Sequence, residues 1–594
     1  MHGYHFKVWK TDLSRGRAVR VGLAPEVFAR VIGGAGLGTW LLLQDCPPNV
    51  DPFAPECPLV FAWAPLAGAA PVALPGSDRF AVVTKSPLTG RLNDATCSSA
   101  FALAGKGTGA DALVISGRCP EWSVLIVDEG GARAEPWPAL LGLSAADAAT
   151  QVRARLGERY HVAAIGPAGE RGARYATLST AGRHAGRGGT GAVLGAKRLK
   201  AVAVAGDALP PVADPAKLAR LVDAWNAHAA SPELARYRES GTLGTLADFE
   251  RRGLLPARNF ATLGRGSGGS SAHAFSVAAG MTRQRDAGSL GAETRFTDAQ
   301  GRPARMEYEN VFSLGALCGV EDPAVVAQAV ACCDAYGLDT ISTGATLAFA
   351  MDCAGRGLEL PPPVAALGLR FGAGAALLAA IEAIGRGDSA GVLLGEGSRR
   401  LAERMGAEAQ ALAPHVKGLE LPGYDPRALP SLALALAVGA RGADHNKSSA
   451  YDADLAEGAP EPYSPASVRA VAEGEERAVL WDSLILSKFL RRALPPGAEG
   501  DAALAKLLAA VTGADCDADS LRECARHVLD LKKVFNQRQG WHAKEDTLPA
   551  RFFAAEGGRA GLDRARFEQA VRDYYRLRGW DARGRSTGSG ARDP

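Results

Sequence analysis

The sequence lacks the cysteine pairs that metal sites use. None of its ten cysteines forms a Cys-x-x-Cys pair, the spacing typical of zinc and iron–sulfur ligands. Cysteines scattered singly along a chain are most often small buried hydrophobic residues, and we expect that role for all ten. They are Cys46, Cys57, Cys97, Cys119, Cys318, Cys332, Cys333, Cys353, Cys516 and Cys524.

The sequence also lacks a long apolar run and a strong excess of charge. Its longest apolar stretch, LPSLALALAVGA (429–440), is too short to span a bilayer, and the N-terminus has no apolar signal-peptide core. A net charge of +3 argues against nucleic-acid binding by bulk electrostatics. With 47% hydrophobic and 22% charged residues, we expect a cytoplasmic globular protein without membrane or nucleic-acid partners.

The first part of the chain has strand-like sequence patterns and the later part has helical ones, which predicts an α+β architecture. Short β-branched runs between Gly and Pro make the first part β-rich. The clearest predicted strands are 79–85, 110–117, 122–130 and 199–206. Beyond them the chain is Ala-rich with helical periodicity, and several predicted helices end at Gly. We predict a β-rich N-terminal domain, two mainly α-helical domains and a solvated tail, at 1–207, 208–415, 416–582 and 583–594.

A glycine-rich, basic loop precedes the predicted strand 199–206. GRHAGRGGTGAVLGAK (182–197) contains six glycines, which permit close approach of a ligand to the backbone. Exposed amide groups together with arginine can bind an anion. The spacing differs from that of a P-loop, and the loop does not open a dinucleotide-binding βαβ unit. From these residues alone, an anion-binding loop and a mobile surface loop remain open.

Nine further phrases occur in a fixed order around this loop. They are GGAGLGTWLL (33–42), LPGSDRFAVVTKSPLTG (74–90), AAIGPAGE (163–170), GLLPARNF (253–260), MEYENVFSLGALCGVEDP (306–323), DAYGLDTISTG (334–344), KGLELPGYDPRA (417–428), ARGADHNK (440–447) and VLWDSLILSKF (479–489). Together they resemble the aldehyde:ferredoxin oxidoreductase family, the tungsten–pterin enzymes, across nearly the whole chain. The resemblance implies a β-rich domain that cradles the cofactor, followed by two helical domains.

The resemblance assigns the glycine-rich loop to the cofactor. Family members hold tungsten, or sometimes molybdenum, through the sulfurs of two pterins, so the metal needs no side chain from the protein. The resemblance implies that the pterins are lined by Ala185, Gly186, Arg187, Gly188 and Arg79. Forked arginine donors match phosphate oxygens, and Mg²⁺ is a candidate bridge between the two pterin phosphates.

Two carboxylate motifs are implied to contact the pterins. DAYGLD supplies Asp334 and Asp339, and the second, half-intact motif begins at Asp482. An aspartate at a helix end can instead act as a cap. That alternative describes Asp334 but leaves Asp339 unexplained.

The ARGADHNK phrase supplies the candidate proton carrier. In the family, the residues equivalent to Arg441 and Lys447 contact the cofactor and the residue equivalent to His445 lies beside the metal. A neutral imidazole can accept the proton released when an activated oxygen attacks a carbonyl. Glu307 and Glu309 are both candidates for its acidic partner, and either could be an exposed strand carboxylate.

The chain departs from the family where an iron–sulfur cluster is normally bound. The four cysteine positions are occupied by oxygen side chains, namely Asp286, Ser289, Glu293 and Ser487. Iron–sulfur clusters need soft thiolate ligands, so we predict that no [4Fe–4S] cluster is bound. A hard cation such as Mg²⁺ at these four residues is a weaker alternative. A second departure lies at Thr96, Ser98 and Ser99, where the family favours an asparagine followed by two glycines, so pterin or Mg²⁺ contacts are expected to differ there.

The family reaction oxidises an aldehyde with water to a carboxylate and passes two electrons through the cluster. We favour an oxidoreductase that acts on a small-molecule substrate and passes electrons to a redox partner subunit or a second small substrate. A non-redox pterin enzyme, of hydratase or isomerase type, and a catalytically silent paralogue that binds a cofactor or partner remain alternatives. The family also suggests a homodimer.

Overall fold

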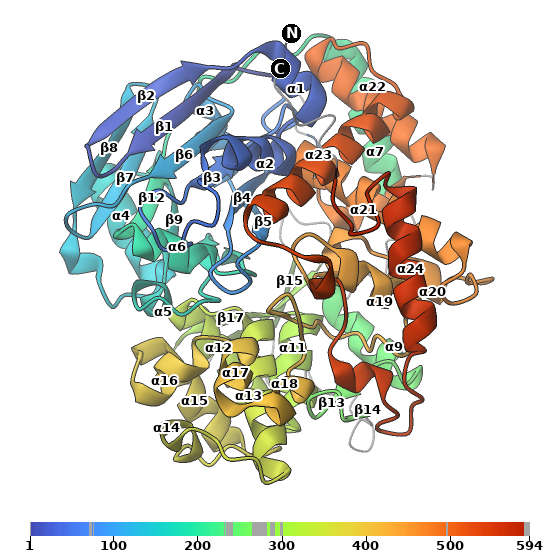
Figure 1. Cartoon of the computed structure of the whole chain (residues 1–594). Helices are drawn as coiled ribbons and strands as arrows, with labels where there is room; N and C mark the ends of the chain where they lie inside the picture. The colour runs from blue at the N-terminus through green and yellow to red at the C-terminus, as the bar shows by residue number, and fades with distance from the viewer. Residues whose placement is uncertain are drawn as a thin grey trace.

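The structure is a computed structural model of the whole chain (Figure 1). It describes residues 2–69, 74, 76–230, 232, 241–263, 282–285, 292–297, 301–494 and 497–586. The first 205 residues form two six-stranded sheets, and most of the remaining described chain is helical. The predicted α+β architecture is confirmed.

The first sheet has the strand order β2-β1-β6-β3-β4-β5. Its strands are β1 (Lys7–Asp12), β2 (Arg17–Gly22), β3 (Leu59–Ala62), β4 (Arg79–Lys85), β5 (Leu92–Ser98) and β6 (Ala112–Ser116). Strand β4 matches its predicted range, because RFAVVTK is an almost continuous apolar run in a strand with neighbours on both sides. Strand β5 pairs antiparallel with β4, so that Arg79 lies opposite Ser98 at one end of the sheet.

The second sheet has the order β11-β10-β9-β12-β7-β8. Its strands are β7 (Ser123–Asp128), β8 (Gly131–Pro136), β9 (His161–Ile165), β10 (Leu178–Thr180), β11 (Arg183–Ala185) and β12 (Leu199–Val204). Alternate apolar side chains of the two sheets share one core, which includes Phe61 and Phe80 from the first and Leu125 and Val202 from the second. The glycine-rich loop begins with the short edge strand β11 and continues into helix α6 (Thr190–Ala196).

The outer face of the first sheet is covered by helices from both ends of the chain. Helix α2 (Gly34–Asp45) lies on β3 and β4 and packs against α21 (Pro465–Leu484) and α23 (Ala518–Arg538). Figure 1 shows α21 and α23, in orange and red, beside the blue helix α2 and the blue strands of the first sheet. One apolar cluster joins them, and it also includes α7 (Pro215–Ala229) and α22 (Ala498–Thr512).

The helices of the middle part begin and end at sequence signals. Helix α12 (Pro323–Tyr336) starts at its N-cap Asp322, whose carboxylate accepts the Ala324 N–H, and stops at Gly337 with φ +75°. Helix α13 (Thr340–Gly355) is almost fully buried. The stretch 398–412 forms two helices, α17 (Ser398–Met405) and α18 (Ala407–Leu412), because Gly406 (φ +101°) interrupts it.

Across the described part of the chain, no single helix has the length and apolar character needed to cross a membrane. Two helix pairs reach this length and apolar character only when the two helices of a pair are counted together. They are Pro25–Val31 with Gly34–Asp45 and Tyr308–Cys318 with Pro323–Tyr336, and each pair is sharply bent.

Eight of the ten cysteines are buried, and Cys516 and Cys524 are half-buried. All ten carry free thiols, in agreement with the expected structural role.

Candidate active site

A cavity of about 410 Å³ lies where the N-terminal domain meets the helical part. Eleven of the fourteen residues singled out from the sequence line it, although they come from segments far apart in the chain. They are Arg79, Thr96, Gly186, Arg187, Glu307, Glu309, Asp334, Asp339, Arg441, His445 and Lys447. The other three, Ala185, Gly188 and Asp482, do not line the cavity, and Asp482 contacts it through Lys447.

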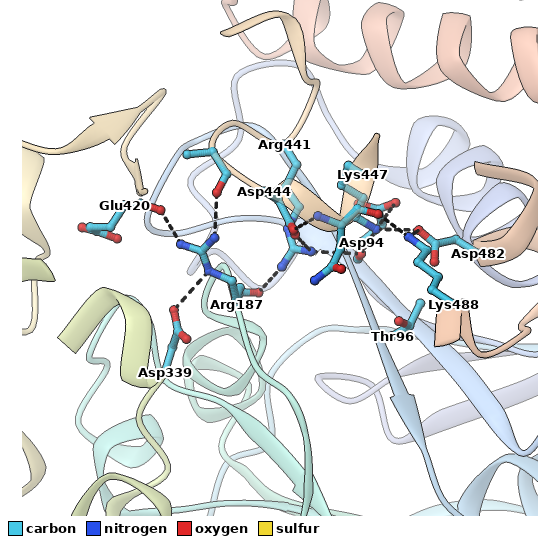
Figure 2. A network of polar contacts seen from close by, with 12 residues as sticks. Asp94, Thr96, Arg187, Asp339, Glu420, Arg441, Asp444, Lys447, Asp482 and Lys488 are labelled. Carbon is cyan, nitrogen blue, oxygen red and sulfur yellow. Dashed lines mark hydrogen bonds and ion pairs between the residues drawn. The ribbon is translucent and has the colours of Figure 1, made fainter. Parts of the chain in front are cut away.

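Arg187 joins the glycine-rich loop to the helical part. Its Nη1 donates to the Ala443 carbonyl oxygen at 2.7 Å and its Nη2 donates to that of Glu420 at 2.5 Å (Figure 2). Its Nε lies 3.5 Å from Asp339 Oδ2, without a formal hydrogen bond within the described chain. The Arg187 side chain is therefore held on three sides at the cavity wall.

Gly188 and Gly189 give this loop its shape. Both have a left-handed backbone, with φ of +84° and +82°. A Cβ on Gly188 would lie 2.0 Å from Oδ1 of the fully buried Asn93, so only glycine fits there. At this position the close neighbour is the Asn93 side chain, and the predicted close approach of a ligand to the loop stays a prediction.

We expect Gly188→Ala to lower the free energy of unfolding by about 2–4 kcal/mol, because it adds a clash to left-handed strain. Gly182→Ala in the same loop is the matched control. Gly182 has a φ of +71° but nothing within 4 Å of its Cβ position, so the control loses only about 1–2 kcal/mol. Urea unfolding of both variants measures the difference, and equal losses would contradict the close approach.

Arg441 and Asp444 form a buried pair next to this loop. Arg441 Nη1 donates to Asp444 Oδ2 at 2.7 Å, and its Nη2 donates to the Arg187 carbonyl oxygen at 2.8 Å. Arg441 Nε is buried and has no hydrogen-bond partner in the described chain. Although burial acts in the opposite direction, Arg441 and Arg187 hold the pKa of Asp444 far below its usual range.

A chain of alternating charges continues from Arg441 to the second carboxylate motif (Figure 2). Lys447 Nζ lies 3.0 Å from Asp94 Oδ2 and 2.9 Å from Asp482 Oδ2. Lys488 Nζ lies 2.9 Å from the same Asp482 oxygen, and Lys532 Nζ lies 2.7 Å from Asp94 Oδ2. Burial would raise the pKa of Asp94, but the surrounding lysines keep it well below its usual range. Both carboxylates therefore stay ionised.

The capping alternative made Asp334 the helix cap, but in the structure Asp339 has that role. Asp339 is the N-cap of α13 and accepts the Ile341 and Ser342 N–H groups at 3.3 and 3.2 Å. Asp334 lies in the last turn of α12, which is capped by Gly337, and its Oδ1 is 3.4 Å from His184 Nε2. The interpretation of Asp334 as the cap was wrong, because α12 ends at its C-cap Gly337 and Asp339 is the N-cap of α13.

His445 lies against aromatic side chains at the cavity wall. It begins the short helix η5 (His445–Lys447), and its ring centroid is 4.8 Å from that of Tyr424. Burial lowers the pKa of His445 to about 3, so the imidazole is neutral near pH 7. Its Nδ1 is buried and has no partner among the described residues.

Glu309 is the carboxyl group that faces this imidazole. Its Oε1 lies 3.6 Å from His445 Nε2, and its Oε2 accepts the Gly423 N–H at 3.0 Å. Burial raises the pKa of Glu309 to about 8, so the carboxyl is protonated at neutral pH. A protonated acid and a neutral base are therefore adjacent, which is an arrangement able to hold and move a proton.

Glu307 lies elsewhere in the same cavity. It is the N-cap of α11 (Tyr308–Leu314), where its side chain and Asn310 form a capping box, and it pairs with Arg305. Glu309 belongs to that helix, so the alternative that these two residues are strand carboxylates was wrong. Residues two apart on a helix point to different sides, which separates the two glutamates.

The four positions of the missing cluster ligands are only partly described. Asp286 and Ser289 lie outside the described residues, and Glu293 belongs to β16 (Ala292–Thr297). Ser487 is buried at the end of the α21 segment, where its N–H donates to the Gly76 carbonyl oxygen at 2.9 Å. The hard-cation alternative at these residues stays a prediction.

Several residues at the cavity were missed by the sequence reasoning. They are Arg183, His184, Arg305, Lys488 and Arg491. His184 Nδ1 is 2.7 Å from Ser179 Oγ, and Arg183 and His184 lie inside the quoted glycine-rich loop. Lys488 follows Ser487 directly in VLWDSLILSKF. For Arg183, His184 and Lys488 the position inside a quoted phrase was the available signal, whereas Arg305 and Arg491 lie just outside those phrases. The residue types alone did not separate any of the five from surface charges.

The cavity has an excess of positive charge. Six arginines and two lysines line it, against five aspartates and glutamates. Buried polar atoms without partners in the described chain are grouped around it, namely Arg187 Nε, Arg441 Nε, Glu309 Oε1 and His445 Nδ1. Such atoms in native proteins call for a bound group, because leaving them unpaired is costly. This donor-rich lining fits an anionic, phosphate-bearing cofactor.

Comparisons with known proteins place the chain in a family of oxidoreductases. The sequence model of the aldehyde ferredoxin oxidoreductase N-terminal domain matches residues 8–206, and that of domains 2 and 3 matches residues 221–592. The chain belongs to the aldehyde ferredoxin oxidoreductase family.

Curated relatives match over almost the full length. The tungsten-containing aldehyde ferredoxin oxidoreductase of Pyrococcus furiosus is 32% identical, and that of Pyrococcus horikoshii is 31% identical. Each match covers 98% of both chains. The aliphatic sulfonate oxidoreductase WOR-like subunit of P. furiosus is 25% identical over 98% of this chain and 96% of its own.

A solved structure shares the fold. It is described as the active site complex BamBC of benzoyl coenzyme A reductase in complex with 1,5-dienoyl-CoA. It has a TM-score of 0.86 and 22% identity, and the match covers 99% of this chain and 97% of that chain.

Proposed function

We propose that the chain is a tungsten or molybdenum bis-pterin oxidoreductase that oxidises an aldehyde to a carboxylate without an iron–sulfur cluster of its own. The observation that carries this proposal is the Glu309–His445 pair at the wall of a cavity rich in arginine and lysine. The family membership and the tungsten-containing relatives support the same cofactor.

Arg79, Arg187, Arg441 and Lys447 would hold the cofactor's anionic groups, with Asp334, Asp339 and Asp482 as acceptors or as positioning residues. Thr96 accepts from Arg79 Nη2 at 2.9 Å and would orient that arginine. Bound there, the metal centre supplies Lewis acidity and two-electron capacity. Mg²⁺ belongs to the same proposal, because it would neutralise the negative charge of the pterin phosphates.

His445 would take the proton released when water adds to the substrate carbonyl, because its imidazole is neutral and buried beside the cavity. Glu309 would hold a second proton next to it and donate to the developing charge on the substrate oxygen. Burial of both groups, with the Tyr424 ring packed against His445, would keep them in the protonation states described.

Electrons would leave through a redox partner subunit or a second small substrate. The sequence has no cysteine between Cys119 and Cys318, the stretch in which three of the family's cluster ligands would lie. That same absence favours the second candidate function, a non-redox pterin enzyme of hydratase or isomerase type. The densely charged cavity argues against a silent paralogue, which would have no need of buried unpaired donors.

Elemental analysis of the purified, cofactor-loaded protein tests the proposal. We expect about one tungsten or molybdenum, about two pterins and almost no iron per chain. Iron near four atoms per chain would contradict the loss of the cluster. Aldehyde-dependent reduction of an artificial electron-accepting dye separates the oxidoreductase from the non-redox alternative, which would leave the dye oxidised.

A further inference from the structure

The segment 422–424 contacts both members of the Glu309–His445 pair. Its Gly423 N–H donates to Glu309 Oε2 at 3.0 Å. The ring centroid of Tyr424 lies 4.8 Å from that of His445, with the two rings tilted by 35°. Because these contacts come from adjacent residues, the separation of the carboxyl and the imidazole depends on where this one segment lies.

The Tyr308 hydroxyl fixes the position of the segment. It donates to the Gly423 carbonyl oxygen, and both residues are buried. The Tyr308 ring packs against Phe249, Phe312 and Tyr424, with ring centroids 5.6, 6.3 and 5.8 Å away. A buried aromatic ring with such neighbours has little freedom to move, so its hydroxyl is a rigid anchor for the segment.

Gly423 permits this contact because it has no Cβ. A Cβ at this position would lie 2.9 Å from the Tyr308 hydroxyl oxygen and 2.9 Å from Phe312 Cγ. Any side chain would therefore push the tyrosine away from the Gly423 carbonyl oxygen. The close packing of Tyr308 on the segment requires glycine here.

We propose that Tyr308 is a positioning residue, whose hydroxyl acts through Gly423 to hold the Glu309 carboxyl opposite the His445 imidazole. Tyr308 and Glu309 are neighbours on α11, so the helix supports the carboxyl from one side and the anchored segment supports it from the other. The importance of this support for turnover rests on the proposed function, whereas the support itself does not.

The Gly423 N–H also favours the ionised form of Glu309. Burial raises the pKa of this carboxyl to about 8, and the Gly423 N–H and Arg187 act in the opposite direction. The other titratable groups around it are His445, Asp339, Asp444, Tyr308 and Tyr424. Loss of the Tyr308 hydroxyl frees the segment and weakens the Gly423 contact, so Glu309 should keep its proton to a higher pH.

Tyr308→Phe tests this inference in the full-length, cofactor-free chain. For each protein, the difference in free energy of unfolding from its Glu309→Gln counterpart isolates the titration of Glu309. In the wild type this difference should fall as the pH rises and become constant near pH 8, the folded pKa of Glu309. In Tyr308→Phe it should become constant about one pH unit higher, which is a tenfold change in the ionisation constant. Urea unfolding at a series of pH values between about 5 and 10 measures both curves.

Tyr175→Phe is the matched control. The buried Tyr175 hydroxyl also donates to a backbone carbonyl oxygen, that of Leu394 at 2.9 Å, but Tyr175 is not among the residues that line the cavity. Both variants lose one buried hydrogen bond and should lose similar stability. Only Tyr308→Phe should shift the pH at which Glu309 titrates, and a Tyr308→Phe chain with the wild-type curve would overturn the inference.

Gly423→Ala keeps the inference testable where Tyr308→Phe does not fold. The added Cβ separates Tyr308 from the segment without changing the tyrosine, so we expect the same upward shift in the titration of Glu309. An unshifted titration in Gly423→Ala would also overturn the inference.

Steady-state kinetics of the cofactor-loaded enzyme test the consequence for turnover. We expect Tyr308→Phe to lower kcat about tenfold and to change KM less than about twofold, because the misplaced carboxyl affects the reaction more than substrate binding. A shifted Glu309 titration in a protein without aldehyde activity would keep Tyr308 as the support of Glu309 and contradict the proposed function. An unshifted titration in an active enzyme would keep the proposed function and overturn this inference.

Discussion

Replacing His445 by glutamine is expected to lower kcat for aldehyde oxidation by about 10²–10⁴-fold, the contribution typical of a positioned general base. Glutamine keeps the size and hydrogen-bonding capacity of the side chain but cannot accept the proton. Since His445 is buried beside Glu309 and is not part of the Arg441–Asp94–Lys447 network, metal and pterin contents should stay near wild type. Dye-linked steady-state kinetics with the cofactor-loaded variant measure the effect.

His184→Gln is the control within the same cavity. His184 contacts Ser179 and Asp334, whereas the contacts of His445 are with Glu309, Tyr424 and Tyr451. We expect kcat of this variant to change less than about tenfold. A His445→Gln enzyme that keeps more than a tenth of wild-type kcat would show that another group handles the proton.

Raising the pH is expected to destabilise the cofactor-free wild-type chain relative to Glu309→Gln. Glu309 has a usual pKa of 4.5 and a folded pKa of about 8. Between these values the folded state binds a proton that the unfolded state does not, so stability falls as pH rises. The slope is about 1.4 kcal/mol per pH unit for one proton, which amounts to several kcal/mol by pH 8. Glutamine has no proton to lose and removes this contribution.

Urea unfolding of both proteins at a series of pH values between about 5 and 9 measures the effect. Glu307→Gln is the matched control two residues away. Burial would raise the pKa of Glu307, but the Arg305 contact lowers it on balance, so this variant should keep the wild-type slope. Parallel stability curves for the wild type and Glu309→Gln would show that Glu309 is ionised in the folded protein.

The choice between Glu307 and Glu309 shows where sequence reasoning stopped. The phrase MEYEN placed both carboxylates near the site, but nothing in five consecutive residues says which one faces a histidine far along the chain. The answer depends on Glu307 capping α11 while Glu309 lies inside that helix. The helical turn then points Glu309 toward Gly423 and His445, and Glu307 toward Arg305.

Strand β4 and the ends of helix α12 were easier to predict from the sequence than the choice between Glu307 and Glu309. RFAVVTK forms β4 over its predicted range because its β-branched run favours an extended strand that is paired on both sides. Asp322 and Gly337 delimit α12 through local backbone hydrogen bonds and a left-handed residue. These are interactions between near neighbours, so their signals are contained in the local sequence.

By itself, the sequence determined the family resemblance, four strands of the N-terminal domain (β4, β6, β7 and β12) and the absence of cysteine between residues 119 and 318. The last follows from composition alone, because no fold can create a thiolate ligand that the chain lacks. Only the tertiary structure decided that Glu309, and not Glu307, faces His445, and that Lys488 lies at the cavity wall. Those positions depend on contacts between segments far apart in the chain, and burial in that packing also determines the pKa values of Glu309 and His445.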